Sequence, residues 1–305
     1  MTIVPIPGSR EDWLRLRTRY VGASETAALW DAQADYASSR FALWLHKAGH
    51  IAAPNVDVER ARWGTLMEPV VAHEIARMEE WGIEWGGFAT DDTTLGMSAT
   101  LDYQITSHTE TAPGHVGRGV LEIKCVDWLV YKRVWGGSPP LYVELQLQHQ
   151  LACTGYQWGA IGALVSGNES HVWRRRARPK MIDEIRVRVS NFWKSISAGQ
   201  KPNIDDRDTT TEALRTLYRV EADTEADIPP DLIAPVQEAC QVMLIEAASR
   251  LSGLRRETAV KNLLLAAMGS ADTAYIPAPD LNSPAYRIKR SANGRLKVIE
   301  MDPSR

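Results

Sequence analysis

Val120-Leu121-Glu122-Ile123-Lys124-Cys125 is the stretch that decides the fold, a short apolar run with an acid and a base inside it. Apolar and charged residues that alternate are typical of a β-strand, and residues two apart on a strand leave the same face. We therefore expect Glu122 and Lys124 side by side on one face of a half-buried strand. Charges in that position cost free energy unless other groups pair with them. The stretch predicts a site in which a metal ion uses the acid and an activated water uses the lysine.

Two more acidic residues stand upstream of this strand. Asp102 comes at the end of the segment 95–101, and Glu68 lies on a predicted helix. An Asp followed by a strand with Glu-x-Lys is the pattern of the PD-(D/E)XK metal-dependent nucleases. We expect Glu68 at the same end of the sheet, so that it converges with Asp102, Glu122 and Lys124.

This set of residues suits the hydrolysis of a phosphodiester, which needs a hard cation to hold the scissile oxygens and to acidify water. Mg²⁺ prefers carboxylate and carbonyl oxygens and keeps several waters. Asp102 and Glu122 would supply two carboxylates, with the carbonyl of Ile123 between the two charged strand residues. Lys124 would orient or deprotonate the attacking water, or neutralise developing charge. Glu68 would bind a second metal or a water, and Mn²⁺ is the alternative ion.

The same residues also have an interpretation without a function, in which Glu122 and Lys124 form an exposed ion pair on a strand and Glu68 is a solvated acid on a helix. Composition decides only in part between this interpretation and a nuclease site. The chain has 305 residues, 44% of them hydrophobic, and a net charge of −3. It is no polycation, so nucleic acid would have to bind through a local cleft and metal ions.

The cysteines and the apolar runs exclude other classes. The three cysteines, Cys125, Cys153 and Cys240, are scattered and form no CxxC motif. That pattern argues against zinc, an iron–sulfur cluster or a disulfide framework. We find no apolar run of transmembrane length and no signal peptide, which predicts a cytoplasmic protein without a membrane partner.

The order of predicted elements is helices, three strands, a helix, two strands and a helix, which indicates an α/β fold with a mixed central sheet flanked by helices. The predicted helices cover residues 11–20, 25–30, 40–47, 65–81, 142–156 and 178–200, the second of them capped by Ser24. The predicted strands cover residues 88–99, 101–106, 120–125, 158–166 and 171–178.

Three regions follow from this order. Residues 1–204 form the predicted core, and the acidic, Thr-rich residues 205–229 are expected to be a linker. Residues 230–305 form an appendage with a helical hairpin and a β-hairpin. The helices would cover 230–250 and 256–268, with their turn at Ser252-Gly253. The strands would cover 285–290 and 295–301, joined by a two-residue turn at Asn293-Gly294.

Several further motifs stand in a fixed order along the chain. They are Trp13-Leu14-Arg15-Leu16-Arg17, Gly22-Ala23-Ser24-Glu25, Phe41-Ala42-Leu43-Trp44-Leu45-His46-Lys47-Ala48-Gly49, Arg62-Trp63-Gly64-Thr65-Leu66-Met67-Glu68-Pro69, Asp102, the strand already quoted, and Tyr142–Leu151 followed by Thr154-Gly155. Over roughly residues 10–200, this series resembles the YqaJ-type viral recombinase family, whose relatives include the phage lambda exonuclease.

The resemblance implies a fold and an activity. The fold would be the PD-(D/E)XK restriction-endonuclease-like core. The activity would be Mg²⁺-dependent digestion of double-stranded DNA from its 5′ ends, within a phage or prophage recombination system. The products would be 3′ single-stranded overhangs for a single-strand annealing protein. The resemblance also implies a homo-oligomer, a ring-shaped trimer that encircles DNA.

The resemblance also assigns roles to residues. Asp102 and Glu122 would bind the metal with help from the Ile123 carbonyl, Lys124 would be catalytic, and Glu68 would support the site. The terminal 5′ phosphate would be held by Arg17 and Ser24. The fork of an arginine suits phosphate, and Ser24 is expected at a helix N-terminus, where the dipole favours anions.

The predicted helix over residues 142–156 carries Gln146, Gln148 and Gln150. The resemblance places Gln146 near the catalytic residues. Three residues at i, i+2 and i+4 cannot share one helix face, so at most two of the three lie in the site. One departure from the family is Tyr103, which follows Asp102 where the family has Gly, and a different turn could follow the metal ligand.

Two alternatives remain open on the sequence alone. One is a restriction- or repair-type endonuclease built on the same core, and the other is a catalytically inactive DNA-binding recombination scaffold. The basic run Arg174-Arg175-Arg176-Ala177-Arg178-Pro179-Lys180 either contacts DNA or is a solvated strand edge.

Overall fold

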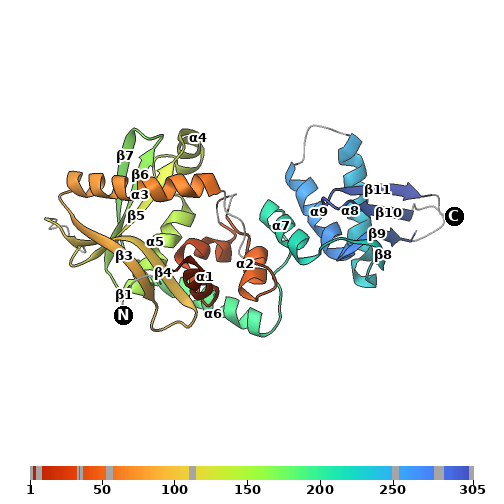
Figure 1. Ribbon diagram of the computed structural model, residues 1–305, viewed down its shortest axis with the longest axis horizontal. Helices are drawn as coiled ribbons and strands as arrows, with labels where there is room; N and C mark the ends of the chain where they lie inside the picture. Colours follow the sequence, from red (N-terminus) through yellow and green to blue (C-terminus); the bar gives the residue numbers. More distant parts are fainter. Residues whose placement is uncertain are drawn as a thin grey trace. The chain divides into compact units, whose positions relative to one another are not determined.

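The computed structural model describes residues 3–4, 9–32, 34, 37–52, 58–109, 115–248, 254–277 and 285–301. The chain divides into two compact units (Figure 1). The first unit comprises Met1–Ala37 and Asn55–Gln200, and the second comprises Ser38–Pro54 and Lys201–Arg305.

The first unit is built on a mixed sheet in the order β1-β3-β4-β5-β6-β7, and β2 pairs with β4. The strands are β1 (Ile3–Val4), β2 (Val21–Gly22), β3 (Gly82–Thr90), β4 (Met97–Ser107), β5 (Gly119–Val126), β6 (Trp158–Val165) and β7 (Glu169–Arg176). β5 runs parallel to β6, and β2 runs parallel to β4. The other neighbours are antiparallel. The expected α/β fold with a mixed central sheet is confirmed.

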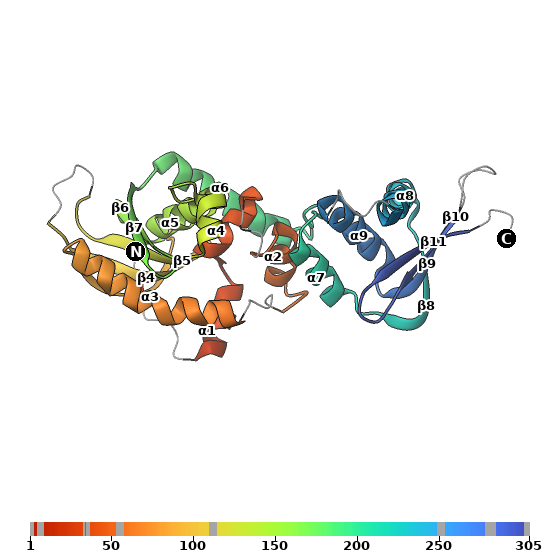
Figure 2. The same ribbon diagram turned by 90° about the horizontal axis from the view of Figure 1, so that it is seen from above.

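Helices cover both faces of this sheet (Figure 2). They are α1 (Arg10–Thr18), the 3₁₀ helix η1 (Ala23–Trp30), α3 (Val58–Met78), α4 (Trp128–Val130), the π-helix η2 (Tyr131–Trp135), α5 (Leu141–Thr154) and α6 (Pro179–Ser197). On one face, Val71 and Ile75 of α3 pack against Tyr103, Leu121 and Ile123. The alternate residues of β4 and β5 face α5. The two charged residues of β5 are therefore on the α5 face.

One strand begins elsewhere than predicted. The sequence suggested strands at 88–99 and 101–106, whereas the break lies between β3 and β4, at residues 91–96. The turn is fixed by Asp91, whose carboxylate accepts hydrogen bonds from Thr93 and from Arg186. Gly96 ends it at φ +76°. An Asp side chain that binds the backbone two residues on is a common turn signal.

Helix α3 begins earlier than predicted, and only one of its apolar sides packs on the sheet. Val71 and Ile75 are buried, but Leu66, Val70 and Met78 are exposed. The contact with the sheet is made by this buried side, which also includes Ala72 and Ala76.

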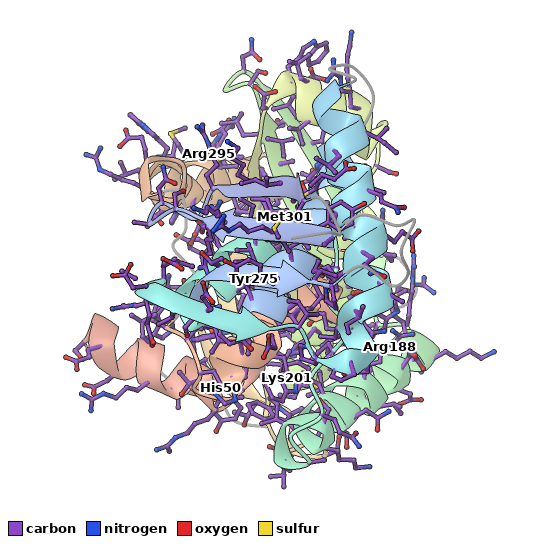
Figure 3. All side chains as sticks on the ribbon, turned by 90° about the vertical axis from the view of Figure 1, so that its right-hand side faces the viewer. His50, Arg188, Lys201, Tyr275, Arg295 and Met301 are labelled. Atoms are coloured by element: carbon purple, nitrogen blue, oxygen red, sulfur yellow. The ribbon has the colours of Figure 1, made fainter. Side chains whose placement is uncertain are left out.

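The second unit holds α2 (Arg40–Lys47) and α7 (Asp208–Leu217) beside a four-stranded sheet, ordered β11-β10-β9-β8. Its other elements are β8 (Glu221–Asp227), η3 (Pro230–Leu232), α8 (Ile233–Ala248), α9 (Leu254–Met268), β9 (Ala271–Ile276), β10 (Ala285–Arg290) and β11 (Leu296–Met301). The core of this unit joins α8 and α9 to one face of the sheet, with Val236, Leu264 and Ile288 fully buried. Figure 3 shows the strands of this sheet, with Tyr275 on β9 and Met301 on β11 labelled.

The boundaries of the second unit differ from the expected ones. Residues 205–229 are no linker, since they contain α7 and β8. Ser39 ties α2 to α7 through Thr209 and Thr210, so an N-terminal segment belongs to this unit as well. The side chains of α7 form hydrogen bonds with residues far away in the sequence. The local composition does not indicate these contacts.

The predicted helical hairpin and β-hairpin are both present. The turn expected at Ser252-Gly253 lies outside the described residues. The loop between β10 and β11 spans residues 291–295, so the expected two-residue turn was wrong. Ser291 accepts a hydrogen bond from the backbone N–H of Arg295, and Gly294 adopts φ +76°. Within the described residues, no helix is long and apolar enough to cross a bilayer.

Candidate active site

The site lies where β4 and β5 separate. The two strands pair only from Tyr103–Leu121 to Ile105–Gly119, and β5 continues to Val126 paired with β6 alone. On the same edge of β4, β2 pairs with Met97 and Ser98. Among the described strands, residues 99–102 of β4 thus face a gap between β2 and β5. Asp102 is the last residue of β4 before the pairing with β5 begins.

Glu122 is the centre of a dense hydrogen-bond network. Its side chain is 1% exposed. One carboxylate oxygen accepts from the ammonium of Lys124 and from Nε2 of Gln146 at 2.6 Å. The other accepts from Nε2 of Gln150 at 2.6 Å. Lys124 also donates to Oε1 of Gln146 at 3.1 Å. The burial is tolerated because both oxygens are bonded and an ammonium neutralises the charge.

Asp102 points into the gap. Its Oδ2 accepts a hydrogen bond from the backbone N–H of Ile123 at 2.8 Å, which replaces the ladder bond lost where the strands part. Burial raises the pKa of Asp102 well above its ordinary value, and the neighbouring Glu122 and then Glu68 raise it further, against the effects of Lys124 and the Ile123 N–H. The N–H and C=O of one strand residue face the same side, so the Ile123 carbonyl borders this gap too.

Glu68 belongs to the same electrostatic group although it stands on α3. Burial raises the pKa of Glu68, Glu122 adds to the rise, and Lys124 opposes it. Glu122 and Lys124 therefore lie close enough to Glu68 and Asp102 to affect the pKa values of these two carboxyl groups. The structure brings Asp102, Glu122, Lys124 and Gln146 together, with Glu68 at their edge.

A divalent cation fits this set of residues. Among the described residues, no group of three or more His, Cys, Asp and Glu side chains is arranged to hold a metal ion. The gap contains two carboxylates and the Ile123 carbonyl, which are hard oxygen donors. Mg²⁺ binds donors of this kind and keeps several waters. Burial and then the neighbouring acids raise the pKa of Asp102, and a cation would relieve the repulsion between the acids.

The three glutamines of α5 lie on two different faces of the helix, as their spacing requires. Gln146 and Gln150, one turn apart, both donate to Glu122. Gln148 faces away: it donates to the carbonyl of Arg176 at 2.9 Å and accepts from the N–H of Arg178 at 2.7 Å. The sequence interpretation singled out Gln146 and missed Gln150. The i, i+4 spacing of these two residues was the signal that could have found it.

Tyr103 causes no turn after Asp102. It sits in the regular ladder of β4, opposite Trp85 on β3 and Leu121 on β5. Its ring is buried on the α3 face and meets the ring of His73 edge-on, with 5.6 Å between centroids. The phenol therefore points away from the face that carries Glu122.

Arg17, on α1, and Ser24, in η1, lie at a second place, beside the short strand β2 that pairs with β4. Arg17 donates to Oε1 of Glu25 at 3.4 Å and lies over the ring of Trp13. The predicted cap was wrong: η1 begins at Ala23 with Gly22 as its N-cap, and Ser24 is an exposed residue of its first turn. Glu25 reaches back to the N–H of Gly22 at 2.8 Å, so the acid of this motif fixes the helix start.

This second place is near the first along the sheet. Gly22 pairs with Ser98, and Asp102 is four residues further along β4. At the rise of a β-strand, that separation is roughly 13 Å. The N-terminus of η1 and the acidic cluster thus border one gap in the sheet.

His149 holds this arrangement together, although no role for it follows from the sequence motifs. The fully buried ring lies between Thr26 Oγ1 of η1, 2.5 Å from Nδ1, and the carbonyl of Ser98, 2.9 Å from Nε2. Because a carbonyl only accepts, Nε2 carries the proton and Nδ1 accepts from the threonine hydroxyl. Burial lowers the pKa of His149 to about 4.

The basic run on β7 is largely paired within the unit. Arg174 forms an ion pair with Glu79 and lies over the ring of Trp81. Arg175 donates to Glu144 at 2.6 Å. These contacts favour a structural role for the two arginines at the strand edge over contact with DNA.

Comparison with known proteins gives a consistent picture. Residues 12–157 match the family model of the YqaJ-like viral recombinase domain. The chain is 26% identical over 274 residues to the uncharacterized protein YqaJ of Bacillus subtilis (strain 168), covering 88% of this chain and 81% of that protein. Among solved structures, it is similar to the alkaline exonuclease LHK-Exo of Laribacter hongkongensis, with a TM-score of 0.49 and 23% identity, over 62% of this chain and 94% of that one. The complex of LHK-Exo with dAMP matches with the same values.

Proposed function

Because the chain carries a YqaJ-like viral recombinase domain over residues 12–157, we propose that it is a Mg²⁺-dependent exonuclease that digests double-stranded DNA from the 5′ end. The observation that carries this proposal is the meeting of Asp102, Glu122 and Lys124 where β4 and β5 part. Two acids and a lysine at such a gap are the groups that metal-assisted phosphodiester hydrolysis requires.

Asp102, Glu122 and the Ile123 carbonyl would hold the metal, with Mn²⁺ as the alternative ion. A divalent cation at this place supplies Lewis acidity to the scissile phosphate and to a water. Gln146 and Gln150 keep the Glu122 carboxylate in one orientation by bonding both of its oxygens. Glu68, on the α3 side, would support the site through a water or a second metal.

Lys124 would act on the water and on the charge that develops at the phosphate. Its ammonium donates to Glu122 and to Gln146, so two acceptors fix its position before substrate arrives. A cation fixed in this way stabilises a developing negative charge without reorganisation. The same hydrogen bonds would orient it toward the attacking water.

The 5′ phosphate would bind at the N-terminus of η1. Arg17 holds Glu25 through a long 3.4 Å contact, which a doubly charged terminal phosphate can replace. The exposed hydroxyl of Ser24 and the first N–H groups of η1 add donors. A terminal phosphate gains more from this pocket than an internal one because it carries more charge.

Further parts of the proposal concern assembly. A ring-shaped homotrimer around DNA would keep the enzyme on its substrate although the net charge of the chain is only −3. The 3′ overhang would pass to a single-strand annealing protein. We place the reaction in the cytoplasm, where the scattered cysteines stay reduced.

End-labelled substrates test this function directly. A blunt linear duplex is labelled on one strand at its 5′ end or at its 3′ end, and a covalently closed circle of the same sequence is the control. With Mg²⁺, the 5′ label should appear at once in mononucleotides or short products, the 3′-labelled strand should shorten gradually, and the circle should survive. Cleavage of the closed circle would establish an endonuclease instead. Intact substrates throughout would indicate an inactive scaffold.

A further inference from the structure

A short exposed element follows β5 directly, and nothing in the proposed chemistry uses it. It consists of α4 and η2, residues 128–135, and we name it the platform. Trp128 is 43% exposed, Leu129 57% and Val134 50%, and the side chains of Lys132 and Arg133 are exposed as well. Large apolar side chains that gather on a surface mark an interaction site more often than single ones do.

The platform is held rigidly, so its exposed rings keep their place. The carboxylate of Asp127 caps it by accepting from the N–H of Leu129 at 2.8 Å. The N–H of Gly136 donates to the carbonyl of Tyr131 at 3.0 Å, which closes a π-turn. Such π-turns are rare in proteins, and those that occur are often found at functional sites.

Aromatic stacking fixes the inner side of the platform to β7. Tyr131 stacks on His171 with ring centroids 5.1 Å apart, and His171 stacks on Trp173 at 5.4 Å. Trp135 is buried against Trp173. On the outer side, the indole of Trp128 stacks on the ring of Tyr131, with ring centroids 6.4 Å apart. Lys132 covers the face of the Trp128 indole through a cation–π contact of 4.7 Å.

The platform borders the catalytic gap. Asp127 is three residues beyond Lys124, which is roughly 10 Å along a strand. If the Tyr103–Leu121 register is continued, Val126 at the end of β5 comes level with Ser98. Ser98 is the partner of Gly22, at the start of η1. The platform and the proposed phosphate pocket thus lie at the same end of the sheet, on the two sides of the gap.

We propose that the platform binds single-stranded DNA next to the catalytic residues, with an unpaired base on the Trp128 ring and phosphates on Lys132 and Arg133. This inference rests on the proposed function. Bases in a duplex are already stacked on their neighbours, so an exposed ring selects the unpaired strand that digestion produces. The ammonium of Lys132 leaves the indole when a base replaces it and is then free to pair with a phosphate. The acid closest in sequence, Asp127, is exposed, and one of its carboxylate oxygens caps α4 by accepting from the N–H of Leu129.

Fluorescence anisotropy of a labelled oligothymidylate tests the proposal. EDTA is present throughout, so that no hydrolysis occurs and binding is measured apart from catalysis. Trp128→Ala should weaken binding by about tenfold or more, the range of one lost base–aromatic stack. Trp128→Phe should restore most of the affinity, because phenylalanine offers a smaller ring of the same kind. The matched control is Trp85→Ala on β3, which removes a 56% exposed tryptophan away from the gap.

A second variant keeps the test valid if Trp128→Ala does not fold. The pair Lys132→Glu and Arg133→Glu changes only exposed side chains, and it should weaken binding steeply at low salt. Equal affinity of wild type, Trp128→Ala and the charge-reversed pair for oligothymidylate would overturn the proposal. The proposal would also be overturned if Trp128→Ala changed the oligomeric state in light scattering but bound oligothymidylate as before. The platform would then be an interface between copies of the chain. The anisotropy assay needs no turnover. Its result can therefore be interpreted even if the end-label assay finds no nuclease activity.

Discussion

His149 should make the first unit lose stability as the pH falls below 7. Its ring is buried and neutral, and its pKa is lowered from 6.5 to about 4 in the folded protein. In the unfolded chain the same ring takes up a proton near pH 6.5. A depressed folded pKa therefore gives stability that is present above pH 6.5 and is lost as the pH falls toward 4.

The magnitude follows from the two pKa values. Linkage between them gives a loss of about 2 kcal/mol from pH 7 to pH 5 for this one residue. That is a sizeable part of the stability of an ordinary domain. His149→Gln replaces the ring with a neutral amide that does not titrate. The variant should be less stable at pH 7, because the contacts to Thr26 and Ser98 are disturbed. Its stability should nonetheless fall by about 2 kcal/mol less than that of wild type over the same pH interval.

Urea unfolding at pH 7 and pH 5 measures this difference. Tryptophan fluorescence reports mainly on the first unit, since every tryptophan except Trp44 belongs to it. The other titratable groups, including Asp102, are common to both proteins and cancel in the comparison. Equal losses in wild type and His149→Gln would refute the reasoning, because they would mean that the ring is not held neutral.

Three further predictions concern single residues. Lys124→Ala should lower turnover by two or more orders of magnitude while calorimetry finds Mg²⁺ affinity little changed, because lysine is no ligand; a large loss of metal binding would contradict its role. Arg17→Ala should reduce the preference for 5′-phosphorylated over 5′-hydroxyl duplex in matched digestion rates, and an unchanged ratio would mean that the end is bound elsewhere. Gly96→Ala should destabilise the first unit by about 2–5 kcal/mol in urea, because it combines φ +76° with a methyl group driven into the Trp193 indole. The control Gly199→Ala, with φ +67° but open space around it, should cost only about 1–2 kcal/mol; equal effects would remove the packing argument.

Period-two patterning was enough to place the charged residues of β5. Glu122 and Lys124 share a face because the strand alternates strictly, and this depends on local sequence alone. The glutamine helix likewise follows from its own spacing. What the pattern could not show is the parting of β4 and β5, which leaves the gap that Asp102 enters. That gap depends on β2 taking the edge of β4, a contact between residues far apart in the chain.

The errors also have physical causes. Ser24 was expected to cap a helix because serine is a favoured cap, but Glu25 bonds the N–H of Gly22 and begins the helix earlier. Residues 205–229 have the acidic, polar composition of a linker. Their α7 is nevertheless ordered by buried side-chain bonds, such as that of Thr211 to Asn262. His149 looked like one more polar residue of α5, and only the packed structure shows the two partners that it joins.

The most direct test of the central claim compares wild type with Glu122→Gln on linear duplex DNA. The substitution keeps the shape of the side chain and removes the charge that would hold the metal, so thermal unfolding should confirm a folded protein. Wild type should release acid-soluble nucleotides only when Mg²⁺ or Mn²⁺ is added, and Glu122→Gln should release none above background. Equal release by the two proteins, or release by wild type in EDTA, would contradict a metal-dependent nuclease centred on Asp102, Glu122 and Lys124.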